Sequence, residues 1–263
     1  MQTVTDERAR EAAAILWSAW QEKRLLEGLP ERCRPRDLGE GYAIQRALGE
    51  LAGATIGWKI AATSKAGQAH INVDRPFPGR LFACFAHASG ATLPARHLHM
   101  RAAEAEFAFR MGRDLPPRDR PYELGEVMAA VGALHIAIEV PDSRYHDYVA
   151  AGAWQMVGDD SCAGYFVLGP EVAAWNGDEL PGHTVALRKE GAVVATGIGS
   201  NVLGDPRLAL TWLANELSQR EHGLRAGEIV TTGTCITPYT IGPGDALTAD
   251  FGTYGTVSVA FEP

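Results

Sequence analysis

The spacing of apolar residues divides the chain into a helical start and a strand-rich remainder. From Asp6 to Glu27, and again after Asp37, apolar side chains recur every three or four positions, which is the period of one helix face. Gly28 and Gly53 follow these stretches and can end the two helices. The pattern therefore predicts a helical region over residues 1–53 that contains two amphipathic helices.

Beyond residue 53 the period changes to two, which is typical of half-buried strands. One further helix is expected after Asp205, an N-cap residue that precedes Pro206 at the first helical position. Because the strands do not alternate with helices as in a doubly wound fold, the pattern predicts an α+β protein whose residues 54–263 form a β-rich domain. The expected strands are residues 56–61, 103–111, 134–140, 165–168, 184–189, 192–196, 228–232, 246–251 and 255–261.

Composition and charge exclude several classes of function. The 263 residues carry a formal net charge of −8, and Lys and Arg are scattered among acidic residues, so no nucleic-acid partner is expected. The longest nearly apolar run, residues 127–138, is shorter than the roughly 20 residues of a membrane helix. No secretory signal is visible at the start, and we therefore expect a cytoplasmic protein with no membrane span. The four cysteines lie far apart, which predicts free thiols and argues against a zinc ribbon.

Three glutamates are the strongest candidates for chemistry. Glu104 and Glu106 are two residues apart in an expected strand, so they project from one face about 6 to 7 Å from each other. Glu139 lies within an almost wholly apolar strand, where an ionised carboxylate needs a partner. Three carboxylates without His or Cys suit a hard cation, Mg²⁺ or Mn²⁺ first, with positions left open for a small 2-keto acid. The alternative is that Glu104 and Glu106 only line a solvated face of the sheet.

Several short motifs occur in a specific order along most of the chain. They are Gly57-Trp58-Lys59-Ile60, Pro78-Gly79-Arg80-Leu81-Phe82, Glu104-Ala105-Glu106, Ile138-Glu139-Val140-Pro141-Asp142, Thr232-Gly233 and Gly244-Asp245. In this order they resemble the fumarylacetoacetate hydrolase superfamily, specifically its branch of 2-keto-4-pentenoate hydratases and 4-oxalocrotonate decarboxylases. The resemblance implies a mixed-sheet roll or barrel with an N-terminal helical appendage. It also implies assembly into homo-oligomers and leaves association with a related pathway enzyme open.

The resemblance further implies roles for individual residues. Glu104, Glu106 and Glu139 would hold the metal. Lys59 would lie near the substrate, either as a proton carrier with a lowered pKa or as a charged group that stabilises the enolate; its alternative is a plain ion pair with one of the glutamates. Asp74 is the second acid or base candidate, with turn capping as its alternative. The backbone of the turn from Gly79 through Leu81 to Phe82 would hold the substrate carboxylate, and the other expected substrate contacts are Cys162 and the hydroxyl of Thr232.

The reaction expected from this resemblance is metal-dependent addition of water to a 2-hydroxypenta-2,4-dienoate-like acid, which gives a 4-hydroxy-2-keto acid. Decarboxylation of a 4-oxalocrotonate-type acid is the alternative. Acylpyruvate-type C–C hydrolysis is less favoured, because none of the eight histidines has a glutamate three residues later, as the hydrolases of the superfamily typically do. Asp160 and Cys162 depart from the Asp-Asn-Ala-Ser-like run of the branch. A non-catalytic partner subunit that keeps the fold is therefore the alternative from another class.

Overall fold

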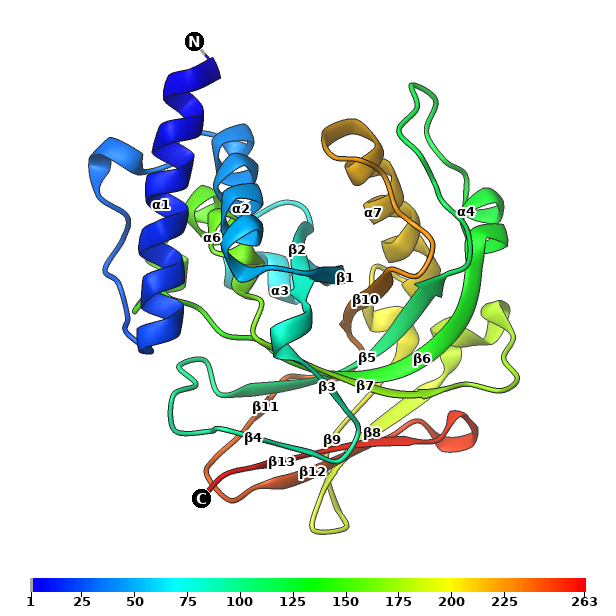
Figure 1. Cartoon of the computed structure of the whole chain (residues 1–263). Helices are drawn as coiled ribbons and strands as arrows, with labels where there is room; N and C mark the ends of the chain where they lie inside the picture. Colours follow the sequence, from blue (N-terminus) through cyan, green and yellow to red (C-terminus); the bar gives the residue numbers. More distant parts are fainter. Residues whose placement is uncertain (1) are drawn as a thin grey trace.

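Two β-sheets that pack face to face carry the fold (Figure 1). The computed structural model describes residues 2–263, with side chains described from residue 6 onward. The larger, 8-stranded sheet is curled and has helices above it, whereas the 5-stranded sheet lies beneath it. This arrangement of mixed sheets and helices confirms the expected α+β class with a β-rich roll.

The larger sheet has the strand order β2-β1-β10-β5-β6-β7-β3, and β11 pairs with β5. β1 and β10 run parallel, whereas β5 runs antiparallel to both β10 and β6. The central strands β5 and β6 are almost entirely buried, so any charged side chain on them needs a partner. The strands are β1 (Thr55–Ala61), β2 (Phe77–Phe82), β3 (Ala86–Ala88), β5 (Ala102–Met111), β6 (Val131–Val140), β7 (Tyr165–Glu171), β10 (Ile229–Thr234) and β11 (Tyr239–Thr240).

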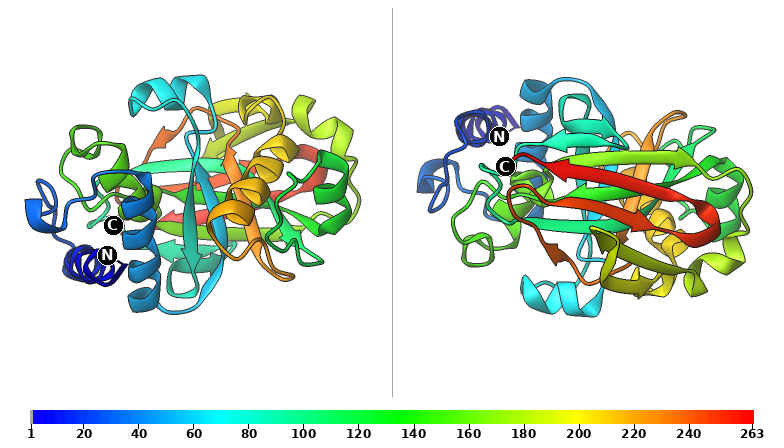
Figure 2. Two further views of the ribbon diagram at one scale, coloured as in Figure 1. Left: turned by 90° about the horizontal axis from the view of Figure 1, so that it is seen from above. Right: turned by 90° about the horizontal axis from the view of Figure 1, so that it is seen from below.

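The smaller sheet has the order β4-β13-β12-β8-β9. Its inner side chains, such as Leu187 and Val257, join Phe107 and Ile136 of the larger sheet in one hydrophobic cluster. In the view from below, β12 and β13 (red) lie in front of the strands of the larger sheet (Figure 2). The apolar faces of both sheets are therefore buried against each other. The strands are β4 (Ala91–Leu93), β8 (Thr184–Lys189), β9 (Ala192–Ile198), β12 (Ala246–Asp250) and β13 (Thr256–Phe261).

The first region consists of two helices, α1 (Gln2–Glu22) and α2 (Leu38–Ala52), as its periodicity predicts. α1 ends earlier than expected, since Lys23 has a φ of 56° that a helix does not continue. The helices share a hydrophobic cluster with Phe82 and Tyr145 of the remainder, and Gln45 of α2 donates a hydrogen bond to the carbonyl oxygen of Pro78 at 2.8 Å. The division into domains 1–53 and 54–263 remains a prediction.

The longest helix of the second half, α7 (Pro206–Arg220), begins as expected, with the Asp205 side chain accepting a hydrogen bond from the backbone of Arg207 at 2.8 Å. The sequence pattern does not predict the other helices, because each is too short to show a period. No described helix combines the length and apolarity that a membrane crossing requires. The short helices are α3 (Lys65–His70), α4 (Leu124–Ala130), α5 (Tyr148–Ala151) and α6 (Ala153–Gly158).

The expected strands agree with the observed ones to within a few residues, but the turn predicted around Gly79 is wrong. Phe77–Phe82 forms β2, which pairs antiparallel with β1 and places Gly79 opposite Lys59. Pro78 and Gly79 are typical turn residues, so they hide the strand in the sequence. β2 ends the strand order of the sheet, and an edge position tolerates proline.

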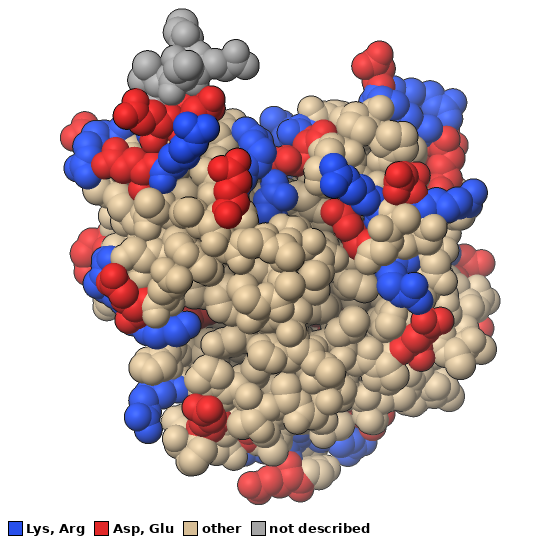
Figure 3. Space-filling view, viewed as in Figure 1, with Lys and Arg blue, Asp and Glu red and all other residues tan. Residues whose placement is uncertain are grey.

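The surface of the molecule mixes both signs of charge. Figure 3 shows acidic and basic side chains interspersed over the helices at the top of one face, above a largely uncharged centre. On this face of the described chain there is no continuous basic stripe. A polyanion such as DNA finds no matching electrostatic surface there.

Candidate metal centre and active site

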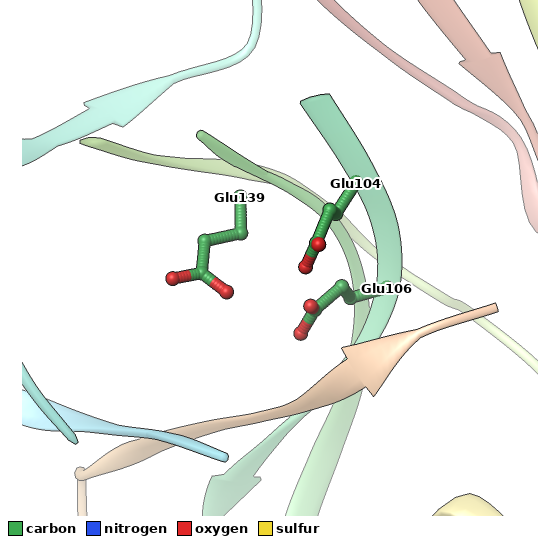
Figure 4. A group of neighbouring side chains, drawn as sticks. All are labelled: Glu104, Glu106 and Glu139. Atoms are coloured by element: carbon green, nitrogen blue, oxygen red, sulfur yellow. The ribbon is translucent and has the colours of Figure 1, made fainter. Parts of the chain in front are cut away.

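The register of the two central strands brings three glutamates together. Glu104 of β5 lies directly opposite Glu139 of β6, and Glu106 follows two residues later on the same face of β5. One carboxylate oxygen from each residue lies within 4.8 Å of the others. Figure 4 shows the three side chains pointing toward one another from the two strands. The sequence spacing predicts the first pair, and the strand pairing supplies the third member.

Burial makes this cluster electrostatically unfavourable by itself. Glu106 and Glu139 are 0% and 1% exposed, and Glu106 Oε1 and Glu139 Oε2 lack any hydrogen-bond partner among the described residues. Desolvation, followed by the charge of Glu139, raises the pKa of Glu104 to about 7 and that of Glu106 well above its ordinary value. Buried carboxylate oxygens without partners fit a divalent cation, because a cation removes both the repulsion and the unmet acceptor capacity.

Lys59 of β1 completes the cluster. Its Nζ lies 2.9 Å from Glu139 Oε1 and donates a hydrogen bond of 3.2 Å to the carbonyl oxygen of Ser161. Burial by itself would lower the pKa of Lys59, but the charges of Glu139 and Glu104 outweigh it and raise that pKa. The ammonium group therefore keeps its proton in this arrangement, and the ion pair considered as the alternative for Lys59 is present.

A left-handed turn holds Lys59 from the other side. Asp160, Ser161 and Cys162 have φ angles of 54°, 52° and 60°, a conformation that costs about 1 to 2 kcal/mol per non-glycine residue. Asp160 Oδ1 accepts a hydrogen bond of 2.7 Å from the Arg80 backbone, and Ser161 Oγ donates one of 2.7 Å to the carbonyl oxygen of Pro78. Tertiary contacts with β2 therefore hold a turn that the local sequence does not favour.

A cavity of about 610 Å³ opens beside the cluster. Of the residues expected to bind substrate or metal, Lys59, Glu104 and Cys162 line it. The Cys162 side chain is neutral, since burial raises the pKa of its thiol to about 12. The cavity thus joins a charged site to a space large enough for a small organic acid.

The structure does not bring Asp74 to this site. The Asp74 side chain is 84% exposed and pairs with the neighbouring Arg75, and it does not line the cavity. An exposed aspartate in the segment between α3 and β2 has no access to a proton on a substrate bound beside Lys59. The expectation that Asp74 acts as a second acid or base is corrected accordingly.

The expected substrate contacts on β2 are also corrected. Leu81 is buried in a small cluster with Phe166, and Phe82 is buried against the N-terminal helices, so neither lines the cavity. Gly79 has a different task, because a Cβ there would lie 2.9 Å from Lys59 Cδ and 2.5 Å from the Asp160 carbonyl oxygen. Its missing side chain lets Lys59 and the left-handed turn approach β2.

The hydroxyl of Thr232 does not face the cavity either, because it donates a hydrogen bond of 3.0 Å to the Phe107 carbonyl oxygen. Its neighbours serve the site instead. The Thr231 hydroxyl and the Gly233 backbone both donate hydrogen bonds to Glu106 Oε2, the latter at 2.8 Å. The sequence analysis missed these two residues, although strand alternation places residues 231 and 233 on the face opposite Thr232.

Comparison with known proteins agrees with this geometry. Residues 61–261 match the family model described as fumarylacetoacetate (FAA) hydrolase C-terminal, which is most of the chain. The chain therefore belongs to the fumarylacetoacetate hydrolase family. This confirms the resemblance inferred from the ordered motifs.

Two relatives and one solved structure are similar to this chain over most of its length. A 2-keto-4-pentenoate hydratase of Paraburkholderia xenovorans (strain LB400) is 31% identical over 98% of this chain and 97% of its own length. A 4-oxalocrotonate decarboxylase of Pseudomonas putida is 30% identical over 84% of this chain and 82% of its own. The solved structure of 4-oxalocrotonate decarboxylase from Pseudomonas putida G7, complexed with magnesium and adipate, superposes with a TM-score of 0.87 at 27% identity, covering 97% of both chains.

Proposed function

We propose that this protein is a metal-dependent hydratase that converts a 2-hydroxypenta-2,4-dienoate-like acid into a 4-hydroxy-2-keto acid. The main support is the cluster of three glutamates, Glu104, Glu106 and Glu139, with Lys59. This cluster adjoins a cavity large enough for a small acid. Support comes from the 31% identity to a 2-keto-4-pentenoate hydratase over nearly the whole length of both chains. The three glutamates are proposed to hold Mg²⁺ or Mn²⁺, because an all-oxygen donor set suits these ions.

The proposed reaction has two stages. The dienol first loses its hydroxyl proton and gains a proton at C5, which leaves a 2-keto acid with a C3=C4 double bond. Water then adds, with its oxygen bonding to C4 and a proton going to C3. When bound, the divalent ion would offer a Lewis acid for the substrate carboxylate and keto oxygen and stabilise the enolate charge.

The protein's own residues handle protons and orientation in this proposal. Lys59 holds a proton at Nζ beside the cavity, and its contacts with Glu139 and the Ser161 carbonyl oxygen fix the direction of the ammonium group. A positive charge there favours an enolate, and the same group can return a proton to carbon. Thr231 and Gly233 keep Glu106 oriented through their hydrogen bonds to its Oε2.

Decarboxylation of a 4-oxalocrotonate-type acid is the second candidate. It is favoured by the TM-score of 0.87 to the magnesium-bound and adipate-bound decarboxylase. Both reactions pass through an enolate, and a cation held by the three glutamates would offset its charge in either case, so the charged site suits both reactions equally. The two reactions differ in whether the carbon skeleton loses CO₂.

The test uses the full chain, freed of metal and then reloaded with Mg²⁺ or Mn²⁺. With 2-hydroxypenta-2,4-dienoate we expect the dienol absorbance to decay, a 4-hydroxy-2-keto acid to form, and no CO₂ to appear. The Glu106→Gln variant should lose this activity, whereas Glu171→Gln, at a half-exposed carboxylate paired with Arg110, serves as the matched control. CO₂ release from an oxalocrotonate without hydration of the dienoate would favour the decarboxylase. Absence of either reaction, together with tight oxalate binding, would support a non-catalytic subunit.

We also infer that the protein assembles into homo-oligomers in the cytoplasm. Large apolar side chains are exposed at Leu51 (46%), Val193 (49%) and Leu208 (46%), and each of them would gain from burial if it lay in a subunit contact. All four cysteines are free, as expected for a protein of a reducing compartment. Light scattering of the purified chain tests the assembly, and a mass equal to the 28.2 kDa monomer would contradict it.

A further inference from the structure

The cavity beside the glutamate cluster has a continuous apolar wall. Five residues of one hydrophobic cluster also line the cavity, and we call this set the apolar wall. They are Ile71, Met100, Tyr148, Met156 and Cys162. They belong to five separate segments, from the end of α3 to the left-handed turn, which converge only in the folded chain. Two of them are methionines, whose flexible thioether side chains adapt to apolar groups of varied shape.

Charge is scarce along the cavity lining. Apart from Lys59 and Glu104, the described lining residues include no Asp, Glu, Lys or Arg, and His70 is the one histidine among them. Lys59 is engaged by Glu139 at 2.9 Å, and His70 lies at an exposed position with its Nε2 3.0 Å from the Tyr148 hydroxyl. The second carboxylate of a dicarboxylic substrate would therefore lose water against the apolar wall without an arginine or lysine in compensation.

The cavity is also larger than the parent substrate needs. A five-carbon dienoate has eight non-hydrogen atoms. At roughly 30 Å³ for each atom, which is the share of a whole water molecule in the liquid, it fills about 240 Å³. The cavity measures about 610 Å³, so more than half of it remains for a larger substituent and for solvent around the ion.

We propose that the apolar wall makes this protein selective for 2-hydroxydienoates that carry an alkyl substituent at C5, over the unsubstituted acid and over dicarboxylates. This inference rests on the proposed hydratase function and names its substrate class. Selectivity arises because an alkyl group at C5 exchanges water for contact with Met100, Met156 and Ile71, whereas a carboxylate at the same place is desolvated.

The first test compares kcat/KM for 2-hydroxypenta-2,4-dienoate, its 5-methyl and 5-ethyl homologues, and the dicarboxylate 2-hydroxymuconate. We expect kcat/KM to rise about fourfold for each added carbon, the value of one buried methylene. The dicarboxylate should react at least about tenfold more slowly than the 5-methyl acid. The same order should appear in calorimetric binding of saturated 2-keto acids of increasing length to Mg²⁺-loaded protein, a measurement that needs no turnover.

Two variants assign the effect to the wall. Met100→Arg places a guanidinium at a half-buried wall position, and it should abolish the alkyl preference and increase the rate with the dicarboxylate. Ile71→Ala is the milder change, and it should reduce the gain per methylene to about twofold or less. Leu25→Ala removes an apolar side chain that is 39% exposed and does not line the cavity, so it should leave the preference as it is.

The results separate this inference from the function on which it rests. Equal kcat/KM values across the alkyl series, or faster turnover of the dicarboxylate, would contradict the proposed alkyl selectivity of the apolar wall. Either result would leave the hydratase proposal intact. If no dienoate reacts, the hydratase proposal fails. The binding series of saturated 2-keto acids then still tests whether the apolar wall favours longer alkyl chains. Affinity that rises with chain length supports the wall in that case, and affinity independent of length rejects it.

Discussion

The two parts of the candidate site are built on different kinds of structure. The charged part consists of Glu104, Glu106, Glu139 and Lys59. These residues lie on strands β1, β5 and β6 of the larger sheet, and the pairing register fixes the position of each side chain. The apolar wall instead comes from short helices and connecting segments. Side chains on paired strands are held in place by several neighbours, whereas connecting segments can change without altering the sheet.

This difference teaches where chemistry and selectivity reside in the molecule. A change in the charged part alters a set of buried charges that interact strongly with one another. It should therefore have large effects on both activity and the free energy of unfolding. A change in the apolar wall alters contact area, so its effects are graded and depend on the substrate. The following expectations test that contrast, beginning with the largest effect.

Lys59→Met should have the largest effect. It leaves Glu139 buried without its cationic partner, and breaking a buried ion pair from one side costs about 3 to 5 kcal/mol. Urea unfolding of the metal-free protein measures the loss, and hydration should fall below detection. The double variant Lys59→Met with Glu139→Gln removes both charges and should recover most of the stability. A single variant as stable as the parent protein would mean that Lys59 does not compensate Glu139.

Glu106→Gln should separate metal binding from folding. It removes one negative charge from a cluster whose carboxyl pKa values are raised by burial and mutual repulsion. The metal-free variant should therefore melt at a higher temperature than the parent protein, while its affinity for Mn²⁺ falls by about a hundredfold or more. Calorimetric titration and thermal melting with and without Mn²⁺ measure both effects. Unchanged Mn²⁺ affinity would contradict the proposed metal site.

Asp160→Asn should change how stability depends on pH. Desolvation raises the pKa of Asp160 from 3.8 to about 7, so between these pH values the folded protein keeps a proton that the unfolded chain has lost. The contribution of Asp160 to stability is therefore full below about pH 4 and decreases as the pH rises toward 7. Asparagine cannot ionise, and it accepts the left-handed conformation well.

The Asp160→Asn variant should accordingly gain at least about 1 kcal/mol over the parent protein at pH 8 and much less at pH 4.5. Parallel denaturant titrations at the two pH values measure this difference. Glu171→Gln, at a half-exposed carboxylate, is again the control. An equal change at both pH values would show that Asp160 is ionised across the whole range.

Tyr148→Phe should have the smallest effect. It keeps the apolar ring in the wall and removes only the hydroxyl that lies 3.0 Å from His70 Nε2. A partly exposed hydrogen bond contributes little, so kcat/KM for the parent dienoate should fall by about threefold or less. Steady-state kinetics measures it beside Lys59→Met. A loss as large as that of Lys59→Met would place essential chemistry in the wall and remove the contrast between the two parts.

The sequence by itself determines the elements and most of the charged part. The change from helical to strand period predicts the two N-terminal helices and most strands, because both periods depend on local burial alone. The two-residue spacing of Glu104 and Glu106 and the apolar surroundings of Glu139 predict an acidic cluster for the same reason. The ordered motifs identify the family.

Only the tertiary structure decides what depends on contacts between distant segments. The segment around Gly79, expected as a turn, forms strand β2, and Asp74 lies away from the site. The residues that contact Glu106 are Thr231 and Gly233, whereas Thr232 was the expected site residue. The apolar wall and the left-handed turn at residues 160–162 leave no periodic signal, since each is held by packing against segments far away in the sequence. Local preferences describe what each segment can do alone, and long-range pairing selects which of these options the folded chain adopts.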